Sequence, residues 1–191
     1  MSEWASYIKS TKNGPPNELL IKAVPYVTTG KLALDLGAGA LCDSKYLAKQ
    51  GFMVMAVDSA PEMMQIKSNE TLARTDMTYK EYFKSFHPDE RFDLINAQWA
   101  LSFEKPEDFD KLLDNIYKSL KKGGIFTGNI YANRHSWAFT RNGMTFWDMF
   151  TYTTFLIRWK VLYSKEKEYI EAPAAGGHPI NWHIFEFILR K

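Results

Sequence analysis

The sequence is poor in cysteine, since Cys42 is the only one among 191 residues. A single cysteine excludes an internal disulfide and any metal site built from cysteines alone. It favours a reducing compartment, where disulfides do not persist. Long apolar runs are missing too: no stretch of about 18 uncharged apolar residues occurs, and residues 1–13 hold no apolar run of signal-peptide length. We therefore expect a cytoplasmic protein with no membrane partner.

An excess of charge of either sign is also absent. The chain has 24 Lys and Arg against 22 Asp and Glu, interspersed, for a net charge of +2. No basic stripe of the kind that binds DNA or RNA is present, so we expect no nucleic-acid partner. The length and the hydrophobic fraction of 46% suit one globular domain with a sizeable core. The oligomeric state is left open.

The chain divides near its start. Residues 13–16 read Asn-Gly-Pro-Pro, which ends one segment and begins another. We expect residues 1–16 to form an N-terminal arm or a lid, and residues 17–191 to form a single domain. The arm is either frayed or folded over a site, and in the second case Trp4 and Tyr7 contact the substrate.

Apolar runs alternate with helical patterns through the middle of the chain. Strands are expected at 31–35, 52–57, 91–97 and 124–131, and helices at 42–49 and 105–121. Such alternation predicts an α/β fold with a Rossmann-like, doubly wound, mostly parallel sheet. Near the end, residues 145–148 resemble a capping box that opens a helix. Two strand-like runs at 158–170 and 182–189, joined by the loop at 171–179, predict a C-terminal antiparallel hairpin.

The first strand ends in a glycine turn with acids on both sides. Gly37 and Gly39 permit a tight bend and a close approach to a ligand, because glycine has no Cβ. Asp35 precedes the turn, and Asp58 ends the next strand, where an acid can bind a ribose diol. Ligands of open α/β sheets bind beyond these strand ends.

The residues after the turn indicate which kind of nucleotide could bind there. A dinucleotide site has a third glycine where this chain has Cys42, and Asp43 would repel a phosphate at the helix start. The chain has no phosphate-loop motif. The pattern therefore favours a nucleoside without phosphates that carries cationic groups near Asp35. S-adenosyl-L-methionine, with its ammonium and sulfonium, fits this description.

Several motifs together carry a family resemblance. D-L-G-A-G, V-D-S, Asp76-Met77, F-D-L-I-N-A and L-K-K-G-G resemble the successive motifs of class I S-adenosylmethionine-dependent methyltransferases, over about residues 17–131. The short length and the ending H-P-I-N-W-H-I-F-E-F-I-L-R-K resemble small enzymes of the tellurite-resistance and thiopurine-like type. The resemblance implies a seven-stranded sheet and a methyl-transfer reaction on a small-molecule acceptor that leaves S-adenosyl-L-homocysteine.

The resemblance also implies roles for residues at matching positions. Asp35 would orient the methionine ammonium, and Asp58 would accept the ribose hydroxyls. Asp76 would meet the adenine amino group. The other implied cofactor contacts are Gly37, Ala38, Gly39, Ser59, Met77, Gln98 and Trp99.

A polar cluster follows the expected strand at 124–131. His135 is the candidate general base, because histidine titrates near neutrality, and Asn133 and Arg134 are candidate substrate contacts. A plain solvated loop is the alternative interpretation. His178 and His183 lack neighbouring cysteines or acids, so we expect no metal.

The sequence therefore predicts an enzyme, a small-molecule methyltransferase, with S-adenosyl-L-methionine as cofactor. One alternative is a non-catalytic S-adenosylmethionine-binding protein. The other is a nicotinamide-dependent reductase, which the missing third glycine disfavours.

Overall fold

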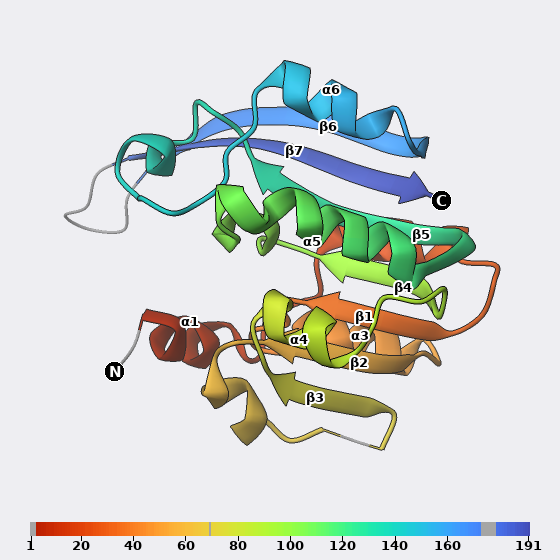
Figure 1. The fold of residues 1–191 in the computed structure, drawn as a ribbon. Coiled ribbons are helices and arrows are strands. Elements are labelled where there is room, and N and C mark those ends of the chain that lie inside the picture. Colours follow the sequence, from red (N-terminus) through yellow and green to blue (C-terminus); the bar gives the residue numbers. More distant parts are fainter. Residues whose placement is uncertain (1–2, 69, 173–178) are drawn as a thin grey trace.

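One seven-stranded sheet forms the centre of the computed structural model, which describes residues 3–68, 70–172 and 179–191 (Figure 1). The strands are β1 (Leu32–Leu36), β2 (Met53–Asp58), β3 (Leu72–Asp76), β4 (Phe92–Ala97), β5 (Leu120–Tyr131), β6 (Lys160–Glu171) and β7 (Ile180–Arg190). Their order is β3-β2-β1-β4-β5-β7-β6. The first five are parallel, and β7 runs antiparallel to both β5 and β6. The Rossmann-like prediction with a C-terminal hairpin is confirmed.

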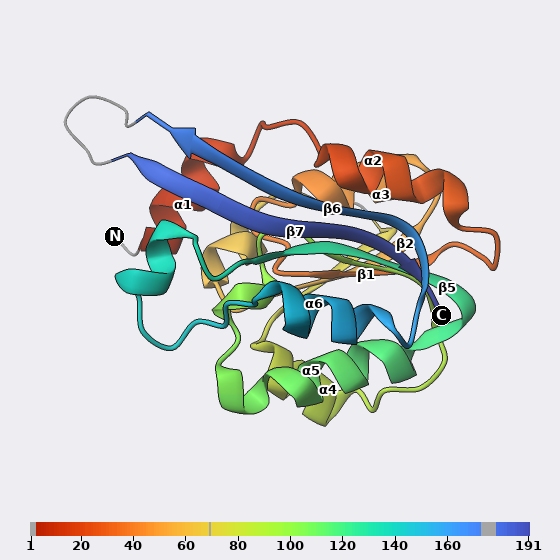
Figure 2. The ribbon, with the colours of Figure 1, turned by 90° about the horizontal axis from the view of Figure 1, so that it is seen from above.

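Helices cover both faces of this sheet and one end of its strands. They are α1 (Glu3–Thr11), α2 (Glu18–Ala23), α3 (Cys42–Lys49), α4 (Tyr79–Ser85), α5 (Pro106–Ser119) and α6 (Met149–Leu156). Figure 2 shows α2 and α3 on one side of the sheet and α4, α5 and α6 on the other. None of the described helices is long and apolar enough to cross a membrane.

The two faces of β1 carry two separate apolar cores. Ala33 packs with Leu20 and Leu47 on the α2 and α3 side. Leu34 packs with Leu112 and other residues of α5 on the opposite side. Because successive strand residues point to opposite faces, a central strand under two helical layers must be apolar throughout. This explains the nearly continuous apolar run of the first strand.

The helix expected at 105–121 ends two residues early. Pro106 occupies its first turn, and Phe109, Leu112, Leu113 and Ile116 are buried on one face. The chain then enters β5 at Leu120 rather than at Gly124. Gly123, with φ of 83°, lies where the register between β4 and β5 shifts, so the glycine pair marks a bulge within the strand rather than a helix stop.

The capping box expected at residues 145–148 is wrong. The helix α6 begins at Met149, and its cap is Asp148, whose carboxylate accepts a hydrogen bond from Thr151 N. The Thr145 hydroxyl instead donates to the carbonyl of Glu104, 2.8 Å away. Most of the hairpin loop expected at 171–179, including His178, lies outside the described residues.

The N-terminal residues form a helix at one end of the sheet. Figure 1 shows α1 beyond the ends of β1 and β2. Ile8 is buried there against Ala40 and Ala60, which follow those two strands. The Cys42 thiol donates to the carbonyl of Thr11, 3.2 Å away, and fixes the end of α1 to the start of α3. The helix therefore lies over the strand ends where ligands bind in this kind of fold.

Candidate functional site

The glycine turn after β1 is fixed by the end of β2. Gly37 N and Ala38 N both donate to the carbonyl of Val57, at 2.8 and 3.1 Å. The Asp58 carboxylate accepts from Gly39 N and from Ala60 N, each at 2.8 Å. Gly37 and Gly39 have φ of 72° and 47°, in the left-handed region that favours glycine. The backbone therefore passes directly over the space beyond the strands.

Two further acids lie beneath this turn. Asp35 is 2% exposed and accepts hydrogen bonds from Ser44 Oγ and, at 2.8 Å, from Asn96 Nδ2. Asn96 Nδ2 also donates to Asp43, 3.0 Å away, and Asp43 accepts from Asn17 N at 2.7 Å. All these partners are neutral donors.

Positive charge is missing from this group of acids. Burial, together with the neighbouring charge of Asp43, raises the pKa of Asp35 to about 7. Burial also raises the pKa of Asp43 and of Asp58. In the part of the chain that the structure describes, no ion pair involves any of the three carboxylates. A cationic ligand would supply the charge that this site lacks.

A chain of amide side chains crosses the ends of the central strands. Gln98 Nε2 donates to Asn96 Oδ1 at 3.0 Å, and Asn129 Nδ2 donates to Gln98 Oε1 at 3.2 Å. Asn129 Oδ1 in turn accepts from Trp99 N at 2.8 Å. Trp99 has φ of 56°, which is uncommon for a bulky side chain and costs backbone strain. The amide chain holds this strained residue at the end of β4.

A cavity of about 730 Å³ opens beside the turn. Nine residues expected from sequence to contact cofactor or substrate line it: Trp4, Tyr7, Gly37, Gly39, Asp58, Ser59, Met77, Gln98 and Trp99. Ten further residues complete the lining: Ile8, Ala60, Thr78, Tyr79, Ala100, Phe103, Glu104, Tyr131, Trp137 and Trp182. The volume is within the range of small-molecule sites.

The structure places the other expected site residues away from this lining. Asp35 is buried beneath the turn, and Ala38 is 8% exposed. The Asp76 side chain is exposed at the end of β3. Asn133 is exposed, and Arg134 forms ion pairs with Glu166 and Glu168 at 3.1 and 2.8 Å.

His135 occupies a different position from the one expected of a base. It is fully buried, and its ring lies 4.4 Å from that of Tyr131. Burial, with the nearby His183 and Arg141, lowers its pKa to about 4. A histidine so placed is neutral at physiological pH and does not line the cavity. We make no further proposal for it as a base.

Sequence reasoning missed most of the aromatic lining. Tyr131 ends an expected strand and Trp137 follows it, but the sequence predicted no role in the site for either. Trp182 is on β7, where it pairs with Tyr169 of β6. Its approach to Trp99, at 5.6 Å between ring centres, depends on the insertion of β7 beside β5. No local pattern contains that information.

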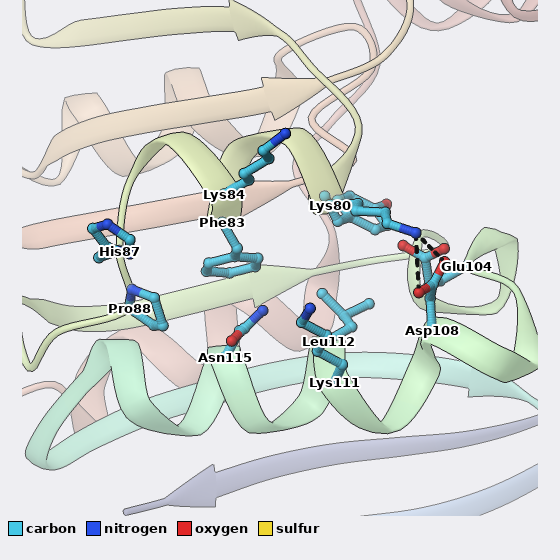
Figure 3. Close-up of a pocket in the computed structure, with 11 residues that line it drawn as sticks. Lys80, Phe83, Lys84, His87, Pro88, Glu104, Asp108, Lys111, Leu112 and Asn115 are labelled. Carbon is cyan, nitrogen blue, oxygen red and sulfur yellow. Dashed lines mark hydrogen bonds and ion pairs between the residues drawn. The ribbon is translucent and has the colours of Figure 1, made fainter.

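A second, smaller cavity of about 350 Å³ lies between α4 and α5 (Figure 3). Its charged lining consists of Lys80, Lys84, Lys111, Glu104 and Asp108, and Lys80 is paired with Asp108 at 3.1 Å. It shares Tyr79 and Glu104 with the larger cavity, but neither the glycines of the turn nor Asp58 line it. We therefore place the functional site in the larger cavity. No group of three or more described His, Cys, Asp or Glu could hold a metal ion.

Comparisons with known proteins converge on one kind of domain. A family model described as a methyltransferase domain matches residues 34–127. Carboxy-S-adenosyl-L-methionine synthase of Vibrio parahaemolyticus is 29% identical over 104 residues, which cover 53% of this chain and 42% of that protein. Demethylmenaquinone methyltransferase of Tropheryma whipplei is 29% identical over 99 residues, covering 51% and 41%. The chain thus spans less than half the length of these curated relatives.

Solved structures share the whole fold. TehB from Haemophilus influenzae has a TM-score of 0.74 at 15% identity, covering 97% of this chain and 65% of that one. The 1,6-didemethyltoxoflavin-N1-methyltransferase of Burkholderia thailandensis, solved with bound 1,6-didemethyltoxoflavin and S-adenosylhomocysteine, has a TM-score of 0.66 at 16% identity, covering 98% of this chain and 86% of that one. At these identities the likeness concerns the fold alone.

The two glycines of the turn differ in how much room a side chain would have at each position. A Cβ on Gly37 would lie 2.4 Å from the Cβ of Ala100, whereas a Cβ on Gly39 would meet nothing closer than 3.8 Å. Both substitutions strain the backbone by about 1–2 kcal/mol. We expect Gly37→Ala to lower the free energy of unfolding by at least about 2 kcal/mol more than Gly39→Ala, because overpacking adds to the strain. Urea denaturation of both variants measures the difference, and equal losses would contradict the geometry.

The raised pKa of Asp35 makes stability depend on pH. Between the unfolded value of 3.8 and the folded value of about 7, the folded protein holds a proton that the unfolded chain has released. Rising pH therefore destabilises the ligand-free protein in this window. We expect Asp35→Asn to gain stability relative to wild type as the pH rises from about 4 to about 7, by a few kcal/mol at most. Thermal unfolding across this range measures the gain.

Asp93 provides a control of opposite sign. Although burial acts against it, hydrogen bonds from Leu32 N and Lys121 lower the pKa of Asp93. Its stabilising effect is present at neutral pH and is lost as the pH falls. Asp93→Asn should therefore lose stability relative to wild type as the pH rises. Parallel curves for the two variants would refute the assignment for Asp35.

Proposed function

Because this chain belongs to the class I S-adenosylmethionine-dependent methyltransferase superfamily, we propose that it transfers a methyl group from S-adenosyl-L-methionine to a small-molecule acceptor. Both molecules would bind in the large cavity beside the glycine turn. The reaction would leave S-adenosyl-L-homocysteine.

The observation that carries the proposal is the group of acids without a cation. Asp35, Asp43 and Asp58 surround the turn and have only neutral hydrogen-bond donors. S-adenosyl-L-methionine brings an ammonium and a sulfonium, so its binding would compensate buried negative charge. A phosphate-bearing cofactor would add negative charge to the same place. This contrast favours a methyl donor over a nicotinamide cofactor.

The roles of individual residues are part of the proposal. Asp35, with Asn96, would orient the ammonium from beneath the turn. Gly39 would pass under the methionine portion, and Asp58 would accept the ribose hydroxyls with lone pairs that its backbone partners leave free. Ser59 and Met77 would contact the adenosine. Asp76 is exposed beyond the lining, so we propose no adenine contact for it.

The chemistry requires little of the protein beyond alignment. A lone pair of the acceptor attacks the methyl carbon, a bond to that carbon forms, and the carbon–sulfur bond breaks with its electrons going to sulfur. The sulfonium is already an activated leaving group. Gln98 and Trp99, fixed by the amide chain, would align the two reactants at the end of β4. Exclusion of water would come from the surrounding aromatic rings.

The helix α1 would act as a lid on this site. Trp4 and Tyr7 line the cavity from α1, and the Trp4 ring packs at 4.9 Å against that of Phe103, which also lines the cavity. The only buried apolar residue among those of α1 whose side chains are described is Ile8, so a small contact area holds the helix in place. Such a segment can open at little cost in free energy.

Binding of S-adenosyl-L-homocysteine tests the cofactor. We expect Asp58→Ala to weaken binding at least about tenfold, because a buried hydrogen-bonded pair is lost. Asp76→Ala, which removes an exposed acid near the end of the neighbouring strand, should change it less than about threefold. Calorimetric titration of wild type and both variants with S-adenosyl-L-homocysteine measures the three affinities. Absence of binding to wild type would reject the proposed function.

Catalysis needs its own measurement, because a sensor protein would also bind the cofactor. An assay of labelled-methyl transfer to thiols, amines, carboxylates and oxyanions distinguishes a methyltransferase from a sensor protein that only binds the cofactor. Binding without transfer to any acceptor would favour the non-catalytic alternative.

Deletion of residues 1–12 tests the lid. We expect turnover to fall by at least about tenfold, while the affinity for S-adenosyl-L-homocysteine changes less than about threefold, because most cofactor contacts come from the strand ends. Turnover and calorimetry on the same preparations give both quantities. Equal losses in both would reject a lid.

A further inference from the structure

Aromatic rings form one continuous wall of the large cavity. They come from distant parts of the chain and contact one another: Trp99 to Trp182 at 5.6 Å, Trp182 to Trp137 at 5.9 Å, Trp137 to Tyr131 at 5.4 Å, and Trp137 to Phe103 at 6.2 Å between ring centres. All five line the cavity. Rings at these separations present both faces and edges to a bound molecule.

This wall is held rigidly from behind. His135 packs against Tyr131, and its Nδ1 accepts a hydrogen bond from Trp137 N at 3.0 Å. The Trp182 indole N–H is engaged by Glu171, 2.6 Å away. A preorganised aromatic surface loses little conformational entropy when a ligand binds.

The charges of the lining have one sign. Among the described residues of the lining, Asp58 and Glu104 are the charged ones, and none is a Lys, Arg or His. Of the nearby cations, Arg134 is paired with Glu166 and Glu168. Arg141 lies over the Trp137 ring at 4.1 Å and is outside the lining. An anionic acceptor would lose its hydration here without a partner and would be repelled by the carboxylates.

Among the described residues of the lining there is no histidine, so a hydroxyl acceptor would have only the carboxylates of Asp58 and Glu104 as a base. His135 lies behind the wall, and the hydroxyl of Tyr79 is engaged with the carbonyl of Ala100 at 3.3 Å. An uncharged nitrogen has a free lone pair and needs no deprotonation before it attacks. After methylation it can release a proton to water, and Glu104 can accept a hydrogen bond from the N–H group.

We propose that the methyl acceptor is a planar aromatic or heteroaromatic amine that is uncharged when it binds and stacks on the wall formed by Trp99, Phe103, Tyr131, Trp137 and Trp182. This assignment rests on the proposed methyl transfer in the same cavity. The nitrogen lone pair forms a bond to the methyl carbon, the carbon–sulfur bond electrons go to sulfur, and the nitrogen gives its proton to water.

Three probes of one shape test the assignment: naphthylamine, naphthol and naphthoate, each with labelled S-adenosyl-L-methionine. We expect naphthylamine to be methylated with a kcat/KM at least about tenfold above that of the other two. A higher or equal value for naphthol or naphthoate would overturn the proposal. So would a failure to methylate all three by a protein that binds S-adenosyl-L-homocysteine. Loss of that binding itself would instead reject the proposed function.

Substitutions in the wall test whether its rings bind the acceptor or only stabilise the fold. Trp182→Leu and Trp137→Leu should each raise KM for naphthylamine about tenfold and change S-adenosyl-L-homocysteine affinity less than about threefold. Phe150→Leu, at a ring that is 79% exposed on α6, is the matched control and should change neither. Unchanged KM in both tryptophan variants would overturn the proposal.

Glu104→Lys reverses the charge at the wall. We expect the preference for naphthylamine over naphthoate, measured as binding to the protein saturated with S-adenosyl-L-homocysteine, to fall at least about tenfold. A preference that does not move would contradict the role given to charge.

Discussion

The main constraint on this structure is buried negative charge that no cation of the described residues compensates. Asp35 is one residue before the end of β1 and Asp58 is the last residue of the neighbouring parallel strand β2, so the topology of the sheet brings both carboxylates to one place. Only backbone N–H groups, a hydroxyl and an amide compensate them. Such carboxylates raise the free energy of the ionised state, and the folded chain tolerates them because the surrounding elements leave them no alternative position. A ligand with positive charge relieves that cost.

The same acids connect the two halves of the cavity. Asn96 bonds Asp35 and Asp43 on one side, and through Gln98 and Asn129 it is linked to the backbone of Trp99. Trp99 begins the aromatic wall. The residues that would hold the methyl donor and the residues that would orient the acceptor therefore belong to one hydrogen-bonded layer across β1, β4 and β5. This layer is more rigid than a set of independent loops.

The sequence was sufficient for features that depend on local patterns. Apolar runs located the parallel strands, and the glycine turn with Asp35 and Asp58 located the cavity. Features that depend on contacts between distant strands could not be predicted from the sequence. Trp182 joins the wall only because β7 inserts between β5 and β6. The polar cluster around His135 looked functional because the burial of a side chain cannot be inferred from three adjacent polar residues in the sequence. The lid remained one of two alternatives, since a helix of nine residues has little signal of its own.

Proton release on ligand binding tests the central claim most directly. Calorimetric titration with S-adenosyl-L-homocysteine near pH 7, in buffers of different ionisation enthalpy, counts the protons exchanged. With a pKa of about 7 the Asp35 carboxyl is half protonated there. Because the ammonium of S-adenosyl-L-homocysteine would favour the ionised Asp35 carboxylate, binding should release up to about half a proton from wild type and less from Asp35→Asn. Binding with no proton release from wild type, or with the same release from both proteins, would contradict the claim.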